Sequence, residues 1–264
     1  MSEFRPLYSA HAIEKCAVSV TFNGALPEKM FSNFIREISM HLEALGLKRQ
    51  ASSPAYTLDT ASGRIVTVAD DYGPATFVSN DGVIELFIVP NSFTFTTQRY
   101  VRWASFLNSF HAITAAVLSW FDNAVSVNSL RLEYWDRFIW TGEWDDFDLQ
   151  KLLKKDTDVL AQRIFASGRE AHCHTGWFEY AGTERRLFNV NVDLVALGTP
   201  HNPTRLDPSV GIYILVQDQS DVENVKKFAD VNLIERLGNL HAVSKTQMAA
   251  LLQPNVTKRI GLGG

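Results

Sequence analysis

The hydrophobic positions along the chain change period several times, and the first change predicts a strand followed by a helix. In residues 17–22 every second side chain is hydrophobic, which is the period of a strand with one buried face. After Pro27, hydrophobic residues recur every three or four positions as far as Leu45, which predicts an amphipathic helix. The chain therefore opens with a strand–helix unit.

Three strands and a long helix are predicted next. Residues 64–69, 83–89 and 93–97 are hydrophobic or alternating stretches bounded by turn residues, which is typical of strands. From Tyr100 to Phe121 a wide hydrophobic stripe recurs at helical spacing. The opposite face of this helix carries small side chains: Ser105, Ser109, Ala112, Ala116 and Ser119. We interpret that face either as plain solvent-exposed surface or as the contact surface of a homodimer.

The second half begins in the same way. Residues 129–138 predict a strand, and residues 146–155, with an extension to about 165, predict a helix. Residues 170–180 and 185–196 predict the two strands of a hairpin, because the turn between them contains Gly182 and glycine supplies the positive φ that a tight turn needs. A strand, a helix and a pair of strands thus follow one another again.

The C-terminal part of the chain predicts one more strand and a helical region. A Pro-rich loop with Pro200, Pro203 and Pro208 precedes a strand at 210–216. Residues 222–252 predict the closing helical region.

This order predicts an α+β fold in a single domain, 1–264. No Ser/Gly linker divides the chain, so we expect two pseudo-equivalent halves, 1–125 and 126–264, each with the order strand, helix, three or four strands, helix. The inference rests on element order, since no repeat of individual residues is visible. We expect a mostly antiparallel sheet with helices packed on one face.

Composition and charge narrow the functional classes. The formal net charge is −4, and Lys and Arg are scattered rather than clustered, which makes nucleic acid an unlikely partner. Cys16 and Cys173 are too few for a disulfide framework. Neither a signal peptide nor a run of about 20 apolar residues is visible, so the sequence predicts a cytoplasmic protein without a membrane segment.

The hairpin holds a candidate metal site. Pairing about the Gly182 turn places His172 opposite Asp193 and His174 opposite Asn191, and Glu170 shares the face of the two histidines. Imidazole and carboxylate groups together are ligands for a divalent metal such as zinc or iron. The alternative is a solvated face without a ligand. Cys173 points to the other side of the strand, so a Cys–His dyad is not expected.

A second polar set is predicted on the uncovered face of the sheet. Its members alternate with hydrophobic residues along neighbouring strands: Arg131, Glu133, Trp135, Arg137, Asn189, Asn191 and Asp193. An aromatic ring among charged groups is typical of binding surfaces. Cross-strand ion pairing is the alternative explanation.

Two central motifs resemble a known protein family. Tyr100 and Trp103 form a Tyr-x-x-Trp helix start, and residues 130–137 form a strand rich in Arg, Leu and Tyr. In both, the chain is similar to a sporadically distributed, uncharacterised bacterial family of similar length. Asp136 stands where the family's pattern favours Asn.

Three further motifs carry the same resemblance. They are the alternating strand at 12–22, the strand at 190–194 with Asn191 in the first acidic position, and the ending of Leu240-His241 with residues 248–252. The resemblance implies no catalytic residue. The family's patchy distribution resembles that of defence or toxin-neutralising genes, and the resemblance therefore implies a role of that kind.

The sequence contains no motif of a known catalytic centre. It has no Gly-x-Ser-x-Gly, no phosphate-binding Gly loop and no paired Cys-x-x-Cys. We therefore expect a non-catalytic binding or accessory protein that acts through protein contacts. The alternatives are a metal-dependent hydrolase that uses His172, His174 and Asp193, and nucleic-acid binding on the open face of the sheet.

Overall fold

The computed structural model describes most of the chain. The described residues are 2–51, 55–59, 64–68, 73–121, 125–166, 170–181, 184–199, 202–220, 226–227 and 232–262. The turn predicted at Gly182, the loop residue Pro200 and the last two glycines lie outside them.

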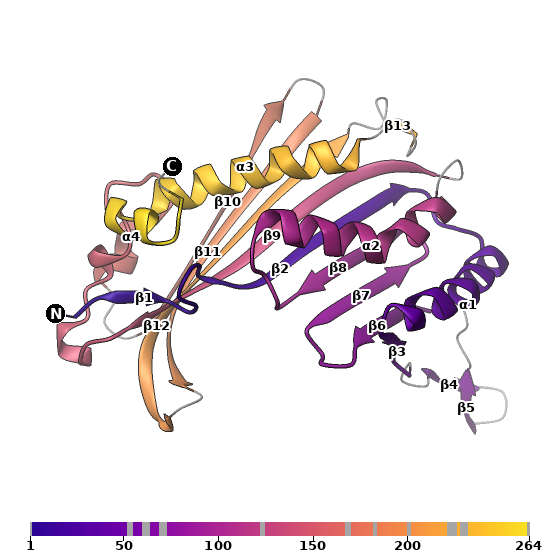
Figure 1. The fold of residues 1–264 in the computed structure, drawn as a ribbon, viewed down its shortest axis with the longest axis horizontal. Coiled ribbons are helices and arrows are strands. Elements are labelled where there is room, and N and C mark those ends of the chain that lie inside the picture. The colour runs from indigo at the N-terminus through magenta and orange to yellow at the C-terminus, as the bar shows by residue number, and fades with distance from the viewer. Residues whose placement is uncertain are drawn as a thin grey trace.

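One large antiparallel sheet forms the centre of the molecule (Figure 1). Its order is β10-β11-β12-β9-β2-β8-β7-β6-β3, and β1 and β13 also pair with β9. The strands are β1 (Phe4–Pro6), β2 (Ile13–Asn23), β3 (Leu47–Arg49), β6 (Ala75–Ser79), β7 (Ile84–Val89), β8 (Ser92–Thr97), β9 (Ser126–Trp140), β10 (Ala171–Ala181), β11 (Glu184–Thr199), β12 (Asn202–Ser220) and β13 (Lys226–Lys227). The predicted α+β class with a mostly antiparallel sheet is confirmed.

Helices cover one face of this sheet (Figure 1). They are α1 (Glu28–Ala44), α2 (Trp103–Phe121), α3 (Leu233–Leu251) and the short α4 (Pro254–Arg259). The hydrophobic stripe of α1 places Phe31, Phe34 and Ile38 in the core, and α2 buries Phe106 and Phe110 there. The predicted hydrophobic faces of α1 and α2 thus pack on one side of the sheet.

The central pair of strands is β2 and β9, which run antiparallel with Val18 opposite Leu132. Strands β8, β7, β6 and β3 extend the sheet beyond β2, and β12, β11 and β10 extend it beyond β9. Helices α1 and α2 accompany the first set, and α3 packs on β12 and β9. The duplication of the two halves stays a prediction.

The helix predicted at 146–165 is wrong. Short 3-10 helices occupy this segment instead: η1 (Trp144–Asp146), η2 (Leu149–Lys151) and η3 (Gln162–Ala166). The backbone N–H of Lys154 donates to the carbonyl of Leu251, and Leu153 forms a bridge with Leu252. These groups are therefore engaged with the end of α3 and cannot continue a helix.

Two other boundaries also differ from the prediction. The C-terminal helix begins at Leu233, where Asn232 accepts a hydrogen bond from the N–H of Glu235, whereas Lys226–Lys227 pairs with β9. Pro203 and Pro208 lie inside β12 rather than in a loop.

Several short strands have no hydrophobic pattern that predicts them. One predicted strand is not part of the large sheet. The missed strands include β3 and β6, whereas β5 (Arg64–Val68) was predicted but pairs with β4 (Ala55–Asp59) in a separate two-stranded sheet.

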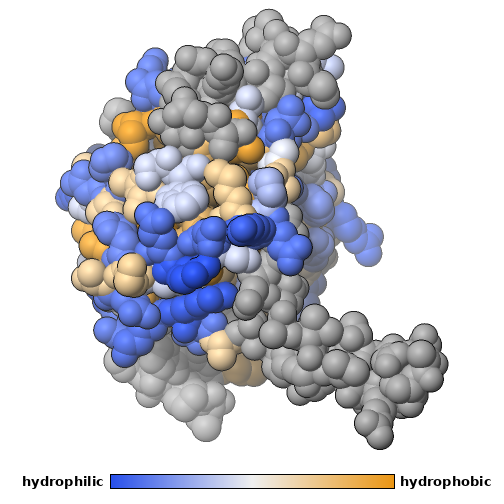
Figure 2. Space-filling view, turned by 90° about the vertical axis from the view of Figure 1, so that its right-hand side faces the viewer, coloured by the Kyte–Doolittle hydropathy of each residue, from blue (hydrophilic) through white to orange (hydrophobic). Residues whose placement is uncertain are grey.

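The surface at the α1 end of the molecule is mainly hydrophilic (Figure 2). Exposed hydrophobic side chains on and after α1 are Met30, Met40 and Leu45, which are scattered rather than contiguous. Among the described residues, no helix combines the length and the hydrophobicity needed to cross a membrane.

Candidate functional site

The predicted register of the hairpin is confirmed. His172 lies opposite Asp193 and His174 opposite Asn191. The Nδ1 atom of His172 is 2.6 Å from Oδ1 of Asp193, and the rings of His172 and His174 are 6.5 Å apart. Cys173 is buried on the other side of the strand.

The histidine–aspartate pair is exposed to solvent. The side chains of His172 and Asp193 are 60% and 46% exposed, and Glu170 is also exposed. Within the described part of the chain, no three His, Cys, Asp or Glu side chains are grouped as a metal ion requires. A metal site at Glu170, His172, His174 and Asp193 stays a prediction.

The second predicted set shares the uncovered face of the sheet, and its charges pair with one another. Arg131 lies 3.0 Å from Glu133 and donates to the hydroxyl of Ser19. Glu133 also accepts a 2.6 Å hydrogen bond from the hydroxyl of Tyr213. The ion pair between Arg131 and Glu133 therefore lies within β9, and hydrogen bonds to Ser19 on β2 and Tyr213 on β12 connect it to the neighbouring strands.

The other members of this set are also mostly engaged. Trp135 packs under the ammonium group of Lys15 at 4.5 Å, and Arg137 pairs with Glu14 at 3.2 Å. The side-chain oxygens of Asn189 and Asn191 are buried and have no hydrogen-bond partner among the described residues. Ligand binding on this face stays a prediction.

The small-residue face of α2 is open to solvent over most of its length. Ser105, Ser109, Ala112 and Ser119 are exposed, and Ala116 is partly buried against the core. A homodimer through this face and a protein partner both stay predictions.

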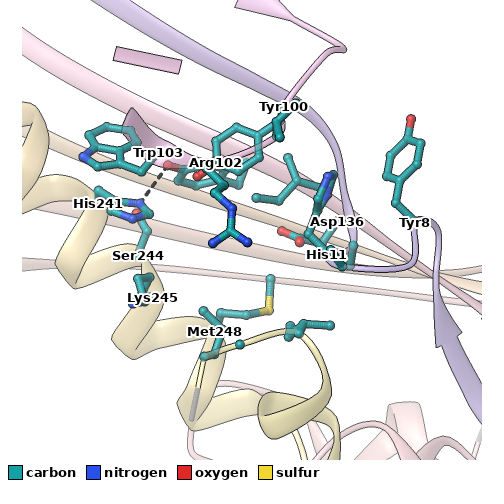
Figure 3. Close-up of a pocket in the computed structure, with 18 of the residues that line it drawn as sticks. Tyr8, His11, Tyr100, Arg102, Trp103, Asp136, His241, Ser244, Lys245 and Met248 are labelled. Carbon is teal, nitrogen blue, oxygen red and sulfur yellow. Dashed lines mark hydrogen bonds between the residues drawn. The ribbon is translucent and has the colours of Figure 1, made fainter. Parts of the chain in front are cut away.

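A groove on the helix-covered side of the sheet is the strongest candidate site (Figure 3). Its volume is about 1060 Å³. The floor comes from β9 and β12, and the walls come from the segment before β2, the start of α2, α3, and the end of α4. Much of its lining is aromatic or aliphatic, including Tyr8, Ile13, Tyr100, Trp103, Tyr134, Ile214, Met248, Ile260 and Leu262.

A stacked pair of rings joins two walls of the groove. Trp103 at the start of α2 stacks on His241 of α3, with ring centroids 4.2 Å apart and planes 9° from parallel. A 2.9 Å hydrogen bond connects Nδ1 of His241 to the hydroxyl of Tyr134 on β9 (Figure 3). Burial, with a smaller contribution from Lys245, lowers the pKa of His241 to about 4, so this ring is neutral near pH 7.

Asp136 is the unusual residue of the floor. Its side chain is on the hydrophobic face of β9, in phase with Leu132 and Tyr134, and the residue is 5% exposed. No other described residue forms a hydrogen bond or an ion pair with its carboxyl group, which lines the groove. Burial raises the pKa of Asp136 to about 7, because the charged form loses its hydration without gaining a partner.

His11 lies beside this carboxyl-bearing floor. Its ring makes an edge contact with Tyr100 at 5.8 Å, and its Nδ1 atom is buried without a hydrogen-bond partner among the described residues. Burial lowers the pKa of His11, so this imidazole is also neutral near pH 7.

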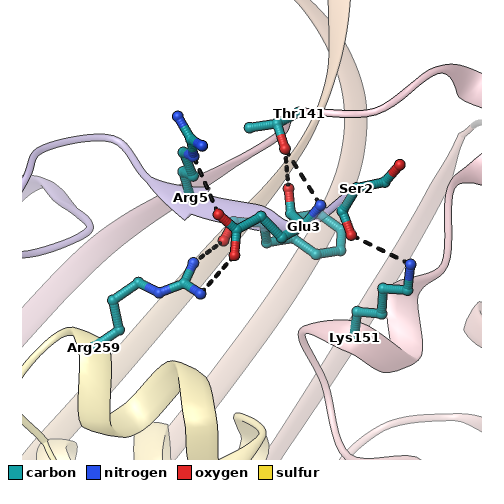
Figure 4. Close-up of polar contacts among 7 residues, drawn as sticks. Ser2, Glu3, Arg5, Thr141, Lys151 and Arg259 are labelled. Atoms are coloured by element: carbon teal, nitrogen blue, oxygen red, sulfur yellow. Dashed lines mark hydrogen bonds and ion pairs between the residues drawn. The ribbon is translucent and has the colours of Figure 1, made fainter.

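The rim of the groove is basic. Arg102, Lys245 and Lys258 are exposed and form no hydrogen bond or ion pair through their side chains with any other described residue. Arg259 is held in place, because it pairs with Glu3 at 2.7 Å and donates to the carbonyl of Phe4 (Figure 4). The N-terminal segment thereby anchors the α4 wall.

The groove was not predicted from the sequence, although one sign of it was present. Asp136 occupies a hydrophobic position of an alternating strand, and carboxylates are rarely buried without a partner. Tyr100, Trp103, Tyr134 and His241 occur in the motifs quoted for the family resemblance, but nothing in the sequence placed these segments together.

No family model matches the chain, and no curated protein matches it. The resemblance to the uncharacterised bacterial family therefore stays a prediction.

Proposed function

We propose that the chain is a non-catalytic binding protein that holds a small amphipathic ligand with an acidic group in the groove. The observation that carries this proposal is the combination of a largely apolar lining with the cations Arg102, Lys245 and Lys258, which pair with no other described residue. The whole chain has a net charge of −4, so a local group of cations is not a by-product of overall basicity. Such a group attracts anions from solution.

The groove has the size and lining of a small-molecule site. Ligand pockets typically measure about 300–1000 Å³ and are lined mostly by apolar side chains with a few polar groups. Burying about 100 Å² of apolar ligand surface contributes roughly 2.5 kcal/mol. An exposed ion pair contributes about 0.2–1 kcal/mol, so the lining supplies most of the affinity and the cations select the charge.

The polar groups near the groove do not favour nucleophilic catalysis. Ser244 donates its hydroxyl to the carbonyl of Leu240. The thiol of Cys16 is fully buried, and burial raises its pKa well above the ordinary value. Both groups are therefore poor nucleophiles near pH 7, which supports binding rather than catalysis.

Fluorescence titration with 8-anilinonaphthalene-1-sulfonate, an aromatic anion, tests this proposal. We expect the variant Arg102→Glu/Lys245→Glu to bind the dye at least tenfold more weakly than the unmodified protein, and added salt to weaken binding as well. The matched control is Lys48→Glu/Arg49→Glu, which makes the same charge change on exposed residues of β3 at the far edge of the sheet. Equal affinity in both variants, with unchanged circular dichroism, would reject the groove as the site.

A further inference from the structure

We propose that the ligand of the groove is a zwitterion, with an ammonium group that pairs with Asp136 and an acidic group that meets the rim cations. This inference rests on the proposed function and adds the chemical class of the ligand. The geometry that carries it is the carboxyl group of Asp136, a residue that is 5% exposed, lines the groove and has no partner among the described residues.

A cation compensates such a carboxylate better than a neutral donor does. A buried charge is costly unless it is paired and hydrogen-bonded. An ammonium group supplies both the opposite charge and three N–H donors. Arg102, Lys245 and Lys258 line the same groove but do not pair with Asp136, so the protein leaves this position to a ligand.

The rings around Asp136 also favour a cation. Tyr100 and Tyr134 meet edge to face, with centroids 5.9 Å apart and planes at 85°, and both rings line the groove together with Asp136. The faces of aromatic rings attract cations. An ammonium group that reaches Asp136 would therefore lie among groups that stabilise positive charge.

Most titratable side chains around Asp136 are neutral near pH 7, and the charged ones in the groove are all cations. Burial raises the pKa values of Cys16 on β2, Tyr134 on β9 and Tyr100 before α2. It lowers those of His11 before β2 and of His241 on α3. The charged side chains that line the groove are those of Arg102 on the α2 side, Lys245 on α3, and Lys258 and Arg259 on α4.

Binding of an ammonium ligand should therefore release a proton from Asp136. The ammonium group keeps its own protons, and the carboxyl proton passes to solvent as the ion pair forms. Because the pKa of Asp136 is about 7 in the free protein, release should approach one proton per bound ligand at pH 6. It should vanish above pH 8.5, where the carboxyl group is already ionised.

A matched pair of probes tests the ligand class. In 6-(aminomethyl)-2-naphthoate and 6-methyl-2-naphthoate the ring and the acid are the same, and the two compounds differ in the amine. In the unmodified protein we expect 6-(aminomethyl)-2-naphthoate to displace the naphthalene dye at a concentration at least tenfold lower than 6-methyl-2-naphthoate requires. In Asp136→Asn this advantage should disappear, while the affinity for 6-methyl-2-naphthoate stays within about twofold.

The outcomes separate this inference from the proposed function. Equal affinity for the two naphthoates overturns the inference, whereas the proposed function stands if the dye still responds to Arg102→Glu/Lys245→Glu. Absence of dye binding in the groove overturns both. If Asp136→Asn fails to fold, calorimetry of the unmodified protein in buffers of different ionisation enthalpy decides, because binding of the amine without proton release at pH 6 contradicts an ion pair with Asp136.

Discussion

The indole of Trp103 lies nearly parallel to the imidazole of His241, at a centroid distance of 4.2 Å. The first residue belongs to α2 and the second to α3, so the two halves of the chain meet at this contact. Since His241 is also hydrogen-bonded to Tyr134 on the floor, the stack holds three sides of the groove in register.

We expect Trp103→Ala to destabilise the protein and to weaken dye binding. The change removes a large, partly buried ring, and we expect a loss of roughly 3 kcal/mol in the free energy of unfolding, measured by urea denaturation. Trp144→Ala is the control, because Trp144 is also partly buried but lies on η1, outside the groove lining. Similar losses of dye affinity in the two variants would show that the stack has no local role.

The pH dependence of stability should change in Asp136→Asn. The pKa of Asp136 rises from an ordinary 3.8 to about 7 on folding. The folded state therefore holds a proton that the unfolded state has lost, and stability falls as the pH rises from about 4 to 7. Removing this group should stabilise the protein by roughly 4 kcal/mol at pH 8, and the difference should vanish below pH 4.

Chemical denaturation at a series of pH values measures this effect. Asp156→Asn is the control, because Asp156 is exposed and its replacement should leave the pH profile unchanged. A variant that is no more stable than the unmodified protein at pH 8 would mean that a group pairs with Asp136 in solution.

The contact between Glu3 and Arg259 should stabilise the protein only when Glu3 is ionised. The hydrogen bond from Arg259 lowers the pKa of Glu3 below its ordinary 4.5. The contribution is therefore present above that value and is lost as the pH falls through the lowered pKa. Because both side chains are partly exposed, we expect Glu3→Gln to cost at most about 1 kcal/mol at pH 7. Thermal melts at pH 7 and pH 3, with Glu43→Gln on α1 as control, measure the difference.

The exposed pair of His172 and Asp193 should contribute little. We expect His172→Ala to change the free energy of unfolding by less than about 1 kcal/mol. Because the described residues contain no three-ligand group, His172→Ala/His174→Ala should retain as much zinc after desalting as the unmodified protein. Elemental analysis that finds one zinc per chain, lost in the double variant, would instead establish the metal site.

The elements with strong local periodicity could be predicted from the sequence. Alternation identified β2, and the turn predicted from the sequence at Gly182 gave the register of His172 against Asp193. The helix prediction for residues 146–165 was wrong because backbone groups of this segment bond to the end of α3. No local sequence pattern indicates such a contact. The very short strands β3 and β13 carry too few residues for a period to be visible.

The candidate groove could not be predicted from local sequence patterns, for a related reason. Its floor is one strand, but its walls come from segments that are far apart in the sequence. The sequence does not predict that Asp136 is a buried carboxylate, because the segments that bury it come together only in three dimensions. Among the polar residues that the sequence did bring together, Arg131 and Glu133 form an ion pair, whereas the side-chain oxygens of Asn189 and Asn191 have no hydrogen-bond partner among the described residues.

The bond between Glu3 and Arg259 joins positions 256 residues apart. The α4 wall, which bears Lys258 and Arg259, is therefore fixed in place by a residue from the opposite end of the described chain. A chain without this contact keeps the floor of the groove, but its α4 side is no longer tied to the N-terminal segment. The shape of the groove consequently depends on the meeting of two segments that are far apart in the sequence, and any change at Glu3 acts on a wall that Glu3 itself does not line.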